Sequence, residues 1–449
     1  MTTVIENGRI IRNGTQIKAN IIVENDKILS VGKKRLATFD LRIDAHGKLV
    51  FPGLVDAHAH IYDPMFPNRE DFTTGTSAAA AGGVTTEIDM VLTTPVDTVD
   101  RVRTKIREGE MNSLVDFSLH AGMMNLSNLP NIRDITSLGV RSFKTFTCKP
   151  YYADDQTLTS LLRETENCSS ILNVHAEDEQ IANQNYARLV EEGRTDPLAH
   201  LEWKPNLAEE LAVEKVVNLT QTLNSRLHIS HLSTVAAANI VKNAKKKHVR
   251  VTAETCPHYL TFTGRDMKKQ GPYLKMNPSL KTQRDVNGLW KSLRDGSVDI
   301  ITSEHAPGGR VEKEVGWKNI WQAWGGVPAI ETMLPVMLSE GVHKKRINLS
   351  TLRRVCSERP AKIFGLYPRK GALKKGSDAD LIIIDLKRTR KVRGERLHYK
   401  VGWTPYENWK LKGWPTLTMV RGKVVFENEQ IIGKTGQAKF IPMQSERIC

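Results

Sequence analysis

The sequence predicts a parallel α/β barrel of the (β/α)8 kind, to which a small β module is attached. From Phe51 to about Phe364, apolar strand-like runs alternate with longer helical patterns, and this alternation is typical of a parallel sheet covered by helices. The stretch is long enough for eight strand–helix units with insertions. β-branched runs separated by turn signals occupy both ends of the chain, so we expect the two ends to pair as one module.

The N-terminal part of the module comes first. Turn signals at Asn7-Gly8 and Asn13-Gly14 separate short β-branched runs, a pattern that indicates small hairpins. In the barrel, strands are predicted within residues 83–90, 141–146, 170–175, 227–231, 249–253 and 298–303. Helices are predicted over 208–224 and 234–247, and β patterns return at 379–385 and 416–426. The predicted division is a barrel over 51–365, with 1–50 and 366–449 as the two parts of the β module.

The composition excludes several classes of protein. The chain has 449 residues and five scattered cysteines without a Cys-x-x-Cys pair, which argues against a disulfide framework or a thiolate zinc site. No apolar stretch approaches the roughly 20 residues that span a bilayer, and the N-terminus does not resemble a signal peptide. We therefore expect a cytoplasmic enzyme with no membrane partner.

The net charge of +15 is confined to the last third of the chain. Residues 310–449 hold 28 Lys and Arg but 13 Asp and Glu, whereas residues 1–309 hold 37 of each. A basic excess can indicate a nucleic-acid partner, but these basic runs carry no interleaved aromatic residues. We interpret the charge as a property of one surface and do not expect nucleic acid as a partner.

The sharpest local signal is the pair His58 and His60 at the end of the strand-like run 55–60. In a strand, residues i and i+2 point to the same face, so both imidazoles can reach one metal ion. A pair of histidines at a strand end can also be structural, and the spacing alone leaves both interpretations open.

Four further polar residues follow apolar strand runs: Lys144, His175, His231 and Glu304. Each has a structural alternative, such as a lysine whose amine reaches solvent or an acid at a helix N-terminus. In a (β/α)8 barrel, however, residues at the C-terminal ends of the strands meet at one mouth. We therefore interpret the six residues as one site. Four imidazoles and a carboxylate can hold zinc, and Lys144, after its amine reacts with carbon dioxide, would supply a bridging anion for a second ion.

Several longer motifs identify a family that the chain resembles. They are residues 51–60, 78–86, 142–146, 174–177, 227–233, 252–260, 303–307 and 376–384. With them the chain resembles, nearly from end to end, the cyclic amidohydrolases, which include dihydroorotases, allantoinases and hydantoinases or dihydropyrimidinases. The resemblance implies a TIM barrel with a small β-sandwich module built from both chain ends, and a homo-oligomer, either a dimer or a tetramer.

The resemblance also implies roles for the six residues. His58 and His60 resemble the ligands of the more buried of two divalent metal ions, which we expect to be zinc, and His175 and His231 those of the more exposed ion. Lys144 resembles the carboxylated lysine that bridges the two ions. Glu304 stands where the family usually has Asp, a metal ligand and the general base and acid. The implied reaction is attack on a ring amide by a metal-bridging hydroxide, with Glu304 transferring the proton.

The substrate is less sharply defined by the resemblance. Dihydroorotases carry an arginine for the substrate carboxylate where this chain has Tyr62, and their other carboxylate-reading groups are replaced at 91–93 and at Gly308. The tyrosine that polarises the substrate in hydantoinases falls at Lys149, so Tyr151 or Tyr152 would have to replace it. We predict a small cyclic ureide or imide as substrate, opened by a hydantoinase-like, dihydropyrimidinase-like or allantoinase-like activity, with Tyr62, Tyr151 and Asn277 as substrate-binding residues.

Two alternatives remain for the function. A dihydroorotase-like activity in pyrimidine biosynthesis is compatible with the frame of motifs but lacks the carboxylate-reading groups. A non-catalytic scaffold is the other, because some relatives of hydantoinases keep the fold and lose the metals. The retained set of a carboxylate, a lysine and four histidines argues against the scaffold.

Overall fold

The computed structural model describes residues 1–12, 14–34 and 36–445. Its parallel strands form the barrel. They are β6 (Leu54–Ala59), β7 (Val84–Asp89), β8 (Asp116–Leu119), β9 (Ala121–Gly122), β10 (Ser142–Phe146), β11 (Ile171–His175), β12 (Leu227–Ile229), β13 (Val251–Thr255) and β14 (Ile300–Ile301). Strands β8 and β9 are two pieces of one barrel position, interrupted at His120, because β8 pairs with β7 and β9 pairs with β10.

The barrel closes between its first and last positions. The remaining neighbours pair in parallel in sequence order, from β10 to β14. Beyond β14, the amide of His60 donates to the carbonyl of His305 over 2.8 Å, and Ala59 forms a parallel bridge with His305. Within the described chain this gives eight strand positions, which confirms the predicted (β/α)8 barrel.

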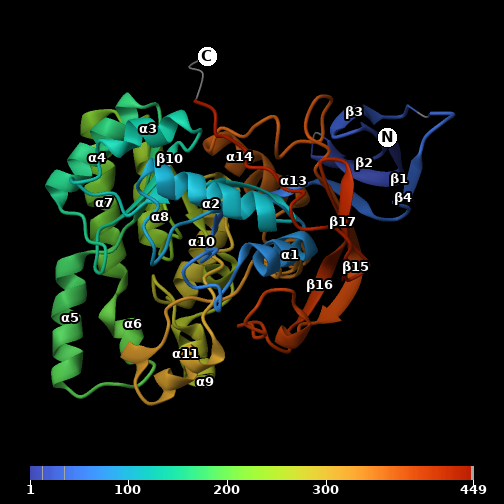
Figure 1. The fold of residues 1–449 in the computed structure, drawn as a ribbon. Helices are drawn as coiled ribbons and strands as arrows, with labels where there is room; N and C mark the ends of the chain where they lie inside the picture. Colours follow the sequence, from blue (N-terminus) through green and yellow to red (C-terminus); the bar gives the residue numbers. More distant parts are fainter. Residues whose placement is uncertain (13, 35, 446–449) are drawn as a thin grey trace.

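Helices connect the barrel strands and surround them (Figure 1). They are α1 (Phe72–Gly82), α2 (Val99–Asn112), α3 (Asn131–Ser137), α4 (Asp155–Asn167), α5 (Glu179–Glu191), α6 (Ala199–Trp203), α7 (Asn206–Leu223), α8 (Val235–Lys246), α9 (Met267–Gln270), α10 (Gln283–Asp295), α11 (Arg310–Glu314), α12 (Met333–Val336), α13 (Leu349–Arg353) and α14 (Arg359–Ile363). Helices α7 and α8 confirm the two helices predicted over 208–224 and 234–247. Side chains of Asp71, Thr98, Asp154 and Thr234 cap helix N-termini, which fixes where these helices begin.

Both chain ends contribute to one sheet beside the barrel, as Figure 1 shows in blue and red. Its strands are β1 (Thr2–Arg12), β2 (Thr15–Glu24), β3 (Lys27–Gly32), β4 (Leu41–Asp44), β5 (Leu49–Pro52), β15 (Leu381–Lys391), β16 (Lys410–Val420), β17 (Lys423–Glu427) and β18 (Gln430–Ile431). Their order is β18-β17-β16-β15-β5-β1-β2-β3, with β4 beside β1.

The seam of this sheet is the antiparallel pair β5 and β15, in which Leu49 lies opposite Ile384 and Pro52 opposite Leu381. Inner side chains of both halves, including Ile21 and Met419, form one apolar core. The expected module from both chain ends is therefore present. Strand β5 runs across the predicted boundary at residue 50, and the boundaries at 50 and 365 stay predictions.

A buried group of charges ties the module to the barrel. The ammonium of Lys370 lies 2.6 Å from Asp116 of β8 and 2.8 Å from Asp380 beside β15, and Arg421 also binds Asp116. Although burial disfavours a charged amine, the attraction of these carboxylates raises the pKa of Lys370 above its ordinary value. The pairing compensates the cost of burying each charge and fixes how the two parts meet.

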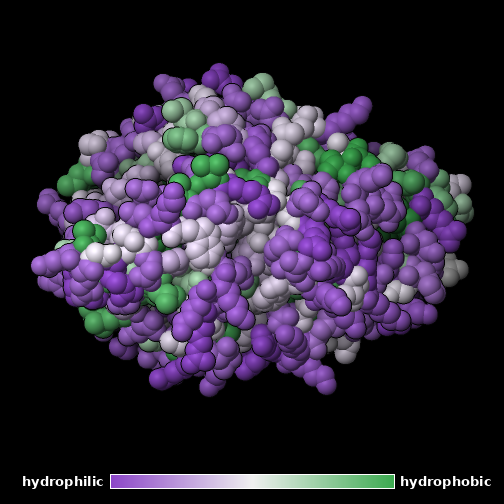
Figure 2. All heavy atoms as spheres, turned by 90° about the horizontal axis from the view of Figure 1, so that it is seen from below, coloured by the Kyte–Doolittle hydropathy of each residue, from purple (hydrophilic) through white to green (hydrophobic). Residues whose placement is uncertain are grey.

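No helix of the described residues is long and apolar enough to cross a membrane. Figure 2 shows that hydrophilic residues dominate the face seen from below, with hydrophobic residues in small separate groups. Scattered apolar residues of this kind are ordinary for a protein surface.

Candidate metal centre

Six side chains from the ends of the barrel strands line one small cavity of about 100 Å³. They are His58 of β6, His60 directly after it, Lys144 of β10, His175 of β11, His231 after β12 and Glu304 after β14. All six are buried, the most accessible being Glu304 at 8%. The structure thus brings together every residue that the sequence analysis predicts as a metal ligand.

Hydrogen bonds orient the first two histidines. The Nδ1 atom of His58 contacts the carboxylate of Glu254, and Nδ1 of His60 lies 2.7 Å from the carbonyl oxygen of Met90. Because a carbonyl or carboxylate oxygen only accepts, each Nδ1 carries the hydrogen and each Nε2 keeps its lone pair. This is the arrangement in which a histidine is fixed by one nitrogen and binds a metal with the other.

The third and fourth histidines face each other. Nδ1 of His175 lies 3.0 Å from Nε2 of His231, and Nε2 of His175 lies 2.7 Å from Glu177, which also binds Lys204. Burial lowers the pKa of His175 to about 4 and that of His231 well below its ordinary value. Both rings are therefore neutral near pH 7, the form in which imidazole binds metals.

Lys144 lies in the same cavity with its ammonium group against the hydroxyl of Ser230. Burial lowers the pKa of Lys144 to about 8, although the carboxylates of Glu254 and Glu304 oppose this shift. A lysine that loses its proton near pH 8 offers a nucleophilic amine, the form that reacts with carbon dioxide. The chemistry of the donor set, four neutral imidazoles with a carboxylate and such a lysine, fits divalent metal ions.

Glu304 and His231 both adopt a left-handed backbone conformation, with φ values of 45° and 32°. Such conformations are unfavourable for residues other than glycine, and they concentrate at functional sites. One carboxylate oxygen of Glu304 lies 3.0 Å from Nε2 of His258, and the other lies 4.0 Å from Nε2 of His231. Burial and the negative charge of Glu254 raise the pKa of Glu304 well above its ordinary value.

The three residues predicted to bind substrate do not all lie in this cavity. Asn277 and Tyr151 line it, whereas Tyr62 stacks against His60, with ring centroids 6.2 Å apart, and lines a neighbouring pocket. The hydroxyl of Tyr62 and the side-chain oxygen of Asn277 are buried without a hydrogen-bond partner among the described residues.

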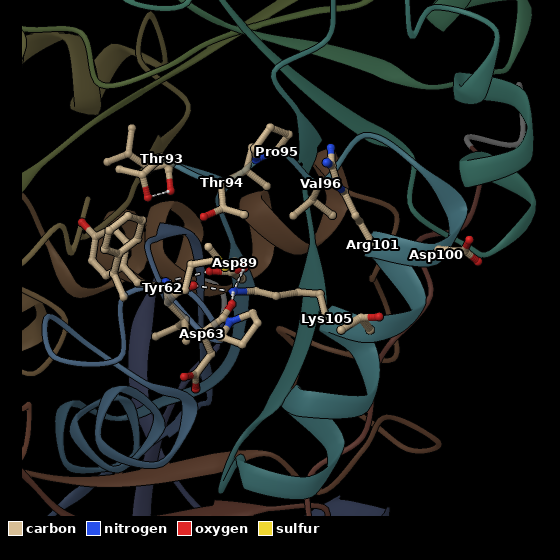
Figure 3. Close-up of a pocket in the computed structure, with 17 residues that line it drawn as sticks. Tyr62, Asp63, Asp89, Thr93, Thr94, Pro95, Val96, Asp100, Arg101 and Lys105 are labelled. Atoms are coloured by element: carbon tan, nitrogen blue, oxygen red, sulfur yellow. Dashed lines mark hydrogen bonds and ion pairs between the residues drawn. The ribbon is translucent and has the colours of Figure 1, made fainter.

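The neighbouring pocket has a volume of about 520 Å³ and is formed by the segments 61–66 and 91–96 and the start of α2 (Figure 3). Leu92 lines both this pocket and the cavity of the six residues. The two cations of the neighbouring pocket are already paired. The ammonium of Lys105 contacts the backbone carbonyls of Ile61 and Asp63, and Arg101 binds Asp97.

Three buried charged residues beside the site are not among the residues predicted from the sequence: Glu254, Glu177 and Lys204. Glu254 is the penultimate residue of β13, the one barrel strand from β10 to β14 to which no candidate was assigned, so its place near the strand end was a usable signal. Glu177 stands two residues after His175. Lys204, directly after α6, had no comparable signal because only the tertiary fold brings it to Glu177.

Known proteins resemble this chain over its whole length. The model of the amidohydrolase family matches residues 49–425. The L-hydantoinase of Paenarthrobacter aurescens is 34% identical over 98% of this chain and 97% of its own, and the dihydroorotase of Methanothermobacter thermautotrophicus is 35% identical over the same shares. The allantoinase of Rubrobacter xylanophilus is 32% identical over 99% of this chain and 98% of its own.

Solved structures agree with these relatives. The L-hydantoinase (dihydropyrimidinase) of Arthrobacter aurescens superimposes with a TM-score of 0.95 at 33% identity, covering 98% of this chain and 99% of its own. The dihydropyrimidinase of Brevibacillus agri gives a TM-score of 0.94 at 28% identity, covering 99% of each chain.

We predict that Glu254→Gln weakens zinc binding by about 10- to 100-fold, because the neutral amide no longer stabilises the hydrogen-bearing Nδ1 of His58. A competition titration with a zinc-binding dye measures the affinity. Glu214→Gln, an exposed change on α7, is the matched control and is expected to leave zinc affinity unchanged. Equal affinities of the two variants would contradict the role of Glu254.

Proposed function

Because the chain belongs to the amidohydrolase family, we propose that it opens a cyclic amide by hydrolysis at the cavity of the six residues. His58, His60, His175, His231 and Glu304 would hold two divalent metal ions, zinc in our proposal, together with carboxylated Lys144. When bound, the ions supply Lewis-acid polarisation of the substrate carbonyl and of water. The meeting of all six side chains in one buried cavity supports this proposal most strongly.

In this proposal Glu304 moves the proton. A carboxylate oxygen of Glu304 accepts a proton from the attacking water and passes it to the ring nitrogen that leaves, as general base and then general acid. His258 holds the other oxygen at 3.0 Å and limits the freedom of the side chain. Burial raises the pKa of Glu304, and a carboxyl group with a raised pKa can hold the proton and return it near neutral pH.

We predict that Glu304→Gln lowers kcat by at least about 100-fold, the scale of general acid–base catalysis, because an amide transfers no proton. Steady-state kinetics on metal-loaded protein measure the change. Glu214→Gln serves again as the control, and circular dichroism verifies that both variants are folded. An unchanged kcat for Glu304→Gln would remove this residue from the mechanism.

We propose that Lys144 is carboxylated. The neutral amine attacks carbon dioxide, an N–C bond forms, and the amine loses a proton, which leaves an anionic carbamate. Ser230, which contacts the ammonium and in turn donates to Asn173, orients the amine. The lowered pKa of Lys144 supports this step because it increases the neutral fraction.

Metal loading is therefore expected to depend on bicarbonate and on pH. Below pH 8 the amine is mostly protonated, so the rate at which metal-free protein regains activity with zinc and bicarbonate should rise with pH and level off above about 8. Reconstitution in buffer free of carbon dioxide should be slow and incomplete. Lys144→Met should show no dependence on bicarbonate, and a wild-type protein that loads equally without it would contradict carboxylation.

We propose a hydantoin with an apolar substituent as the preferred substrate. The metal-centre cavity, at about 100 Å³, suits a small ring, and the adjoining pocket of about 520 Å³ gives room for a substituent. Its walls include Met65, Phe66 and Leu92. A carboxylated ring such as dihydroorotate would need a free cation, but Lys149 and Lys204, which line the cavity, are paired with Glu179 and Glu177.

A substrate panel tests this choice: hydantoin, 5-benzylhydantoin, dihydrouracil, allantoin and dihydroorotate. We predict the highest kcat/KM for 5-benzylhydantoin. Leu92→Glu should lower this value by at least about tenfold, the cost of facing an apolar group with a charge, and should affect unsubstituted hydantoin less. A preference for allantoin or dihydroorotate would refute the proposal of an apolar substituent, but it would leave the proposal of a cyclic amidohydrolase standing.

A dimer or tetramer in the cytoplasm remains our prediction for the assembled enzyme.

A further inference from the structure

A second large cavity lies in the β module, and none of the six metal-centre residues lines it. Its volume is about 510 Å³, within the range of small-molecule binding pockets. Strands β1, β3 and β5, the segment before β15 and Arg353 of α13 form its walls. The cavity therefore lies where the two chain ends and the barrel meet.

The floor of this module cavity is apolar and continues the core of the module. Ile10 and Val50 belong to that core, and Val31 and Leu373 are half-buried against it. An apolar group placed in the cavity would contact the same side chains that hold the module together. Burial of such a group is favourable because it removes apolar surface from water.

The rim of the module cavity carries only positive charge among its described residues. Its charged members are Arg12, Arg353, Lys374 and Lys375, and no carboxylate lines the walls. Arg12 and Lys375 form no ion pair with any residue that the structure describes, whereas Arg353 approaches Glu358 at 3.3 Å. Four cations around an apolar floor create a potential that attracts an anion.

Two polar atoms in the walls have no hydrogen-bond partner among the described residues. The hydroxyl of Ser30 and the Nε atom of Arg353 are buried and make no hydrogen bond within the described chain. Buried polar groups are nearly always paired, so unpaired ones require an explanation. Both can donate a hydrogen bond to an oxyanion, and the Ser30 hydroxyl adds a neutral donor to the charged rim.

We propose that the module cavity binds an organic anion with one carboxylate head and an apolar body. The head lies among the four cations and accepts hydrogen bonds from Ser30 and Arg353, and the body covers Val31, Val50 and Leu373. A purely polar anion would leave the floor in contact with water, and an apolar cation would be repelled by the rim. This site is separate from the proposed reaction and does not depend on it.

Decanoate, below its micellar concentration, is the probe. Isothermal titration calorimetry on the full-length, zinc-loaded protein should detect its binding, and decylamine and acetate should not bind at the same concentration. The triple variant Arg12→Ala, Lys374→Ala, Lys375→Ala should weaken decanoate binding by at least about tenfold. The matched control Lys387→Ala, Lys391→Ala, Lys410→Ala removes three exposed charges from another part of the module and should change the affinity less than about twofold.

A second measurement locates the site without relying on a variant. In hydrogen exchange, decanoate should protect the amides of residues 9–12 and 29–31 in the wild-type protein and leave those of the triple variant unprotected. The proposal is overturned if decanoate does not bind at about 1 mM, if decylamine binds equally well, if both triple variants lose affinity alike, or if protection appears elsewhere.

Discussion

The proposed metal centre depends on a single buried carboxylate, that of Glu254. It contacts Nδ1 of His58, lies 3.1 Å from Nε2 of His228 and accepts the backbone amide of His231 at 3.1 Å. Burial alone would raise its pKa, but His58 and His228 hold the pKa below the ordinary value. This carboxylate therefore orients the ring of His58, holds the backbone at His231 and links strands β12 and β13. A buried charge with several partners is costly to disturb because each partner would lose its hydrogen bond.

The barrel supplies the geometry that makes this possible. The C-terminal ends of the parallel strands meet at one mouth of the barrel. His231 and Glu304, which follow β12 and β14, adopt left-handed backbone conformations there. Strained backbone at both positions is compensated by the surrounding hydrogen bonds rather than by local sequence. Two cavities adjoin at this mouth, the small polar cavity of the six residues and the larger apolar pocket, and Leu92 lines both.

The fold and the six residues of the site could be predicted from the sequence, whereas several other features could not. Strand–helix alternation and β-rich ends predicted the fold, because periodicity and turn chemistry are local properties. The six residues followed from polar positions at strand ends. The sequence did not distinguish the two cavities: Tyr62, predicted to bind substrate, stacks against His60 and lines the neighbouring pocket, and its role stays a prediction. Lys204 was invisible in the sequence because its partner Glu177 is 27 residues away. The seven-residue π-helix over Met337–His343 also escaped, since helical periodicity does not distinguish its hydrogen-bond pattern.

The seam between β5 and β15 has a consequence for how the protein is made. Pro52 pairs with Leu381, so the first strands of the module must wait until nearly the whole barrel has been synthesised. At about 5–20 residues per second this delay is roughly 15–65 s. During it, the apolar inner faces of β1, β2 and β5 have no partner from the other chain end, and such faces are prone to association. The barrel, whose strands pair with neighbours close in sequence, can form before the module is complete.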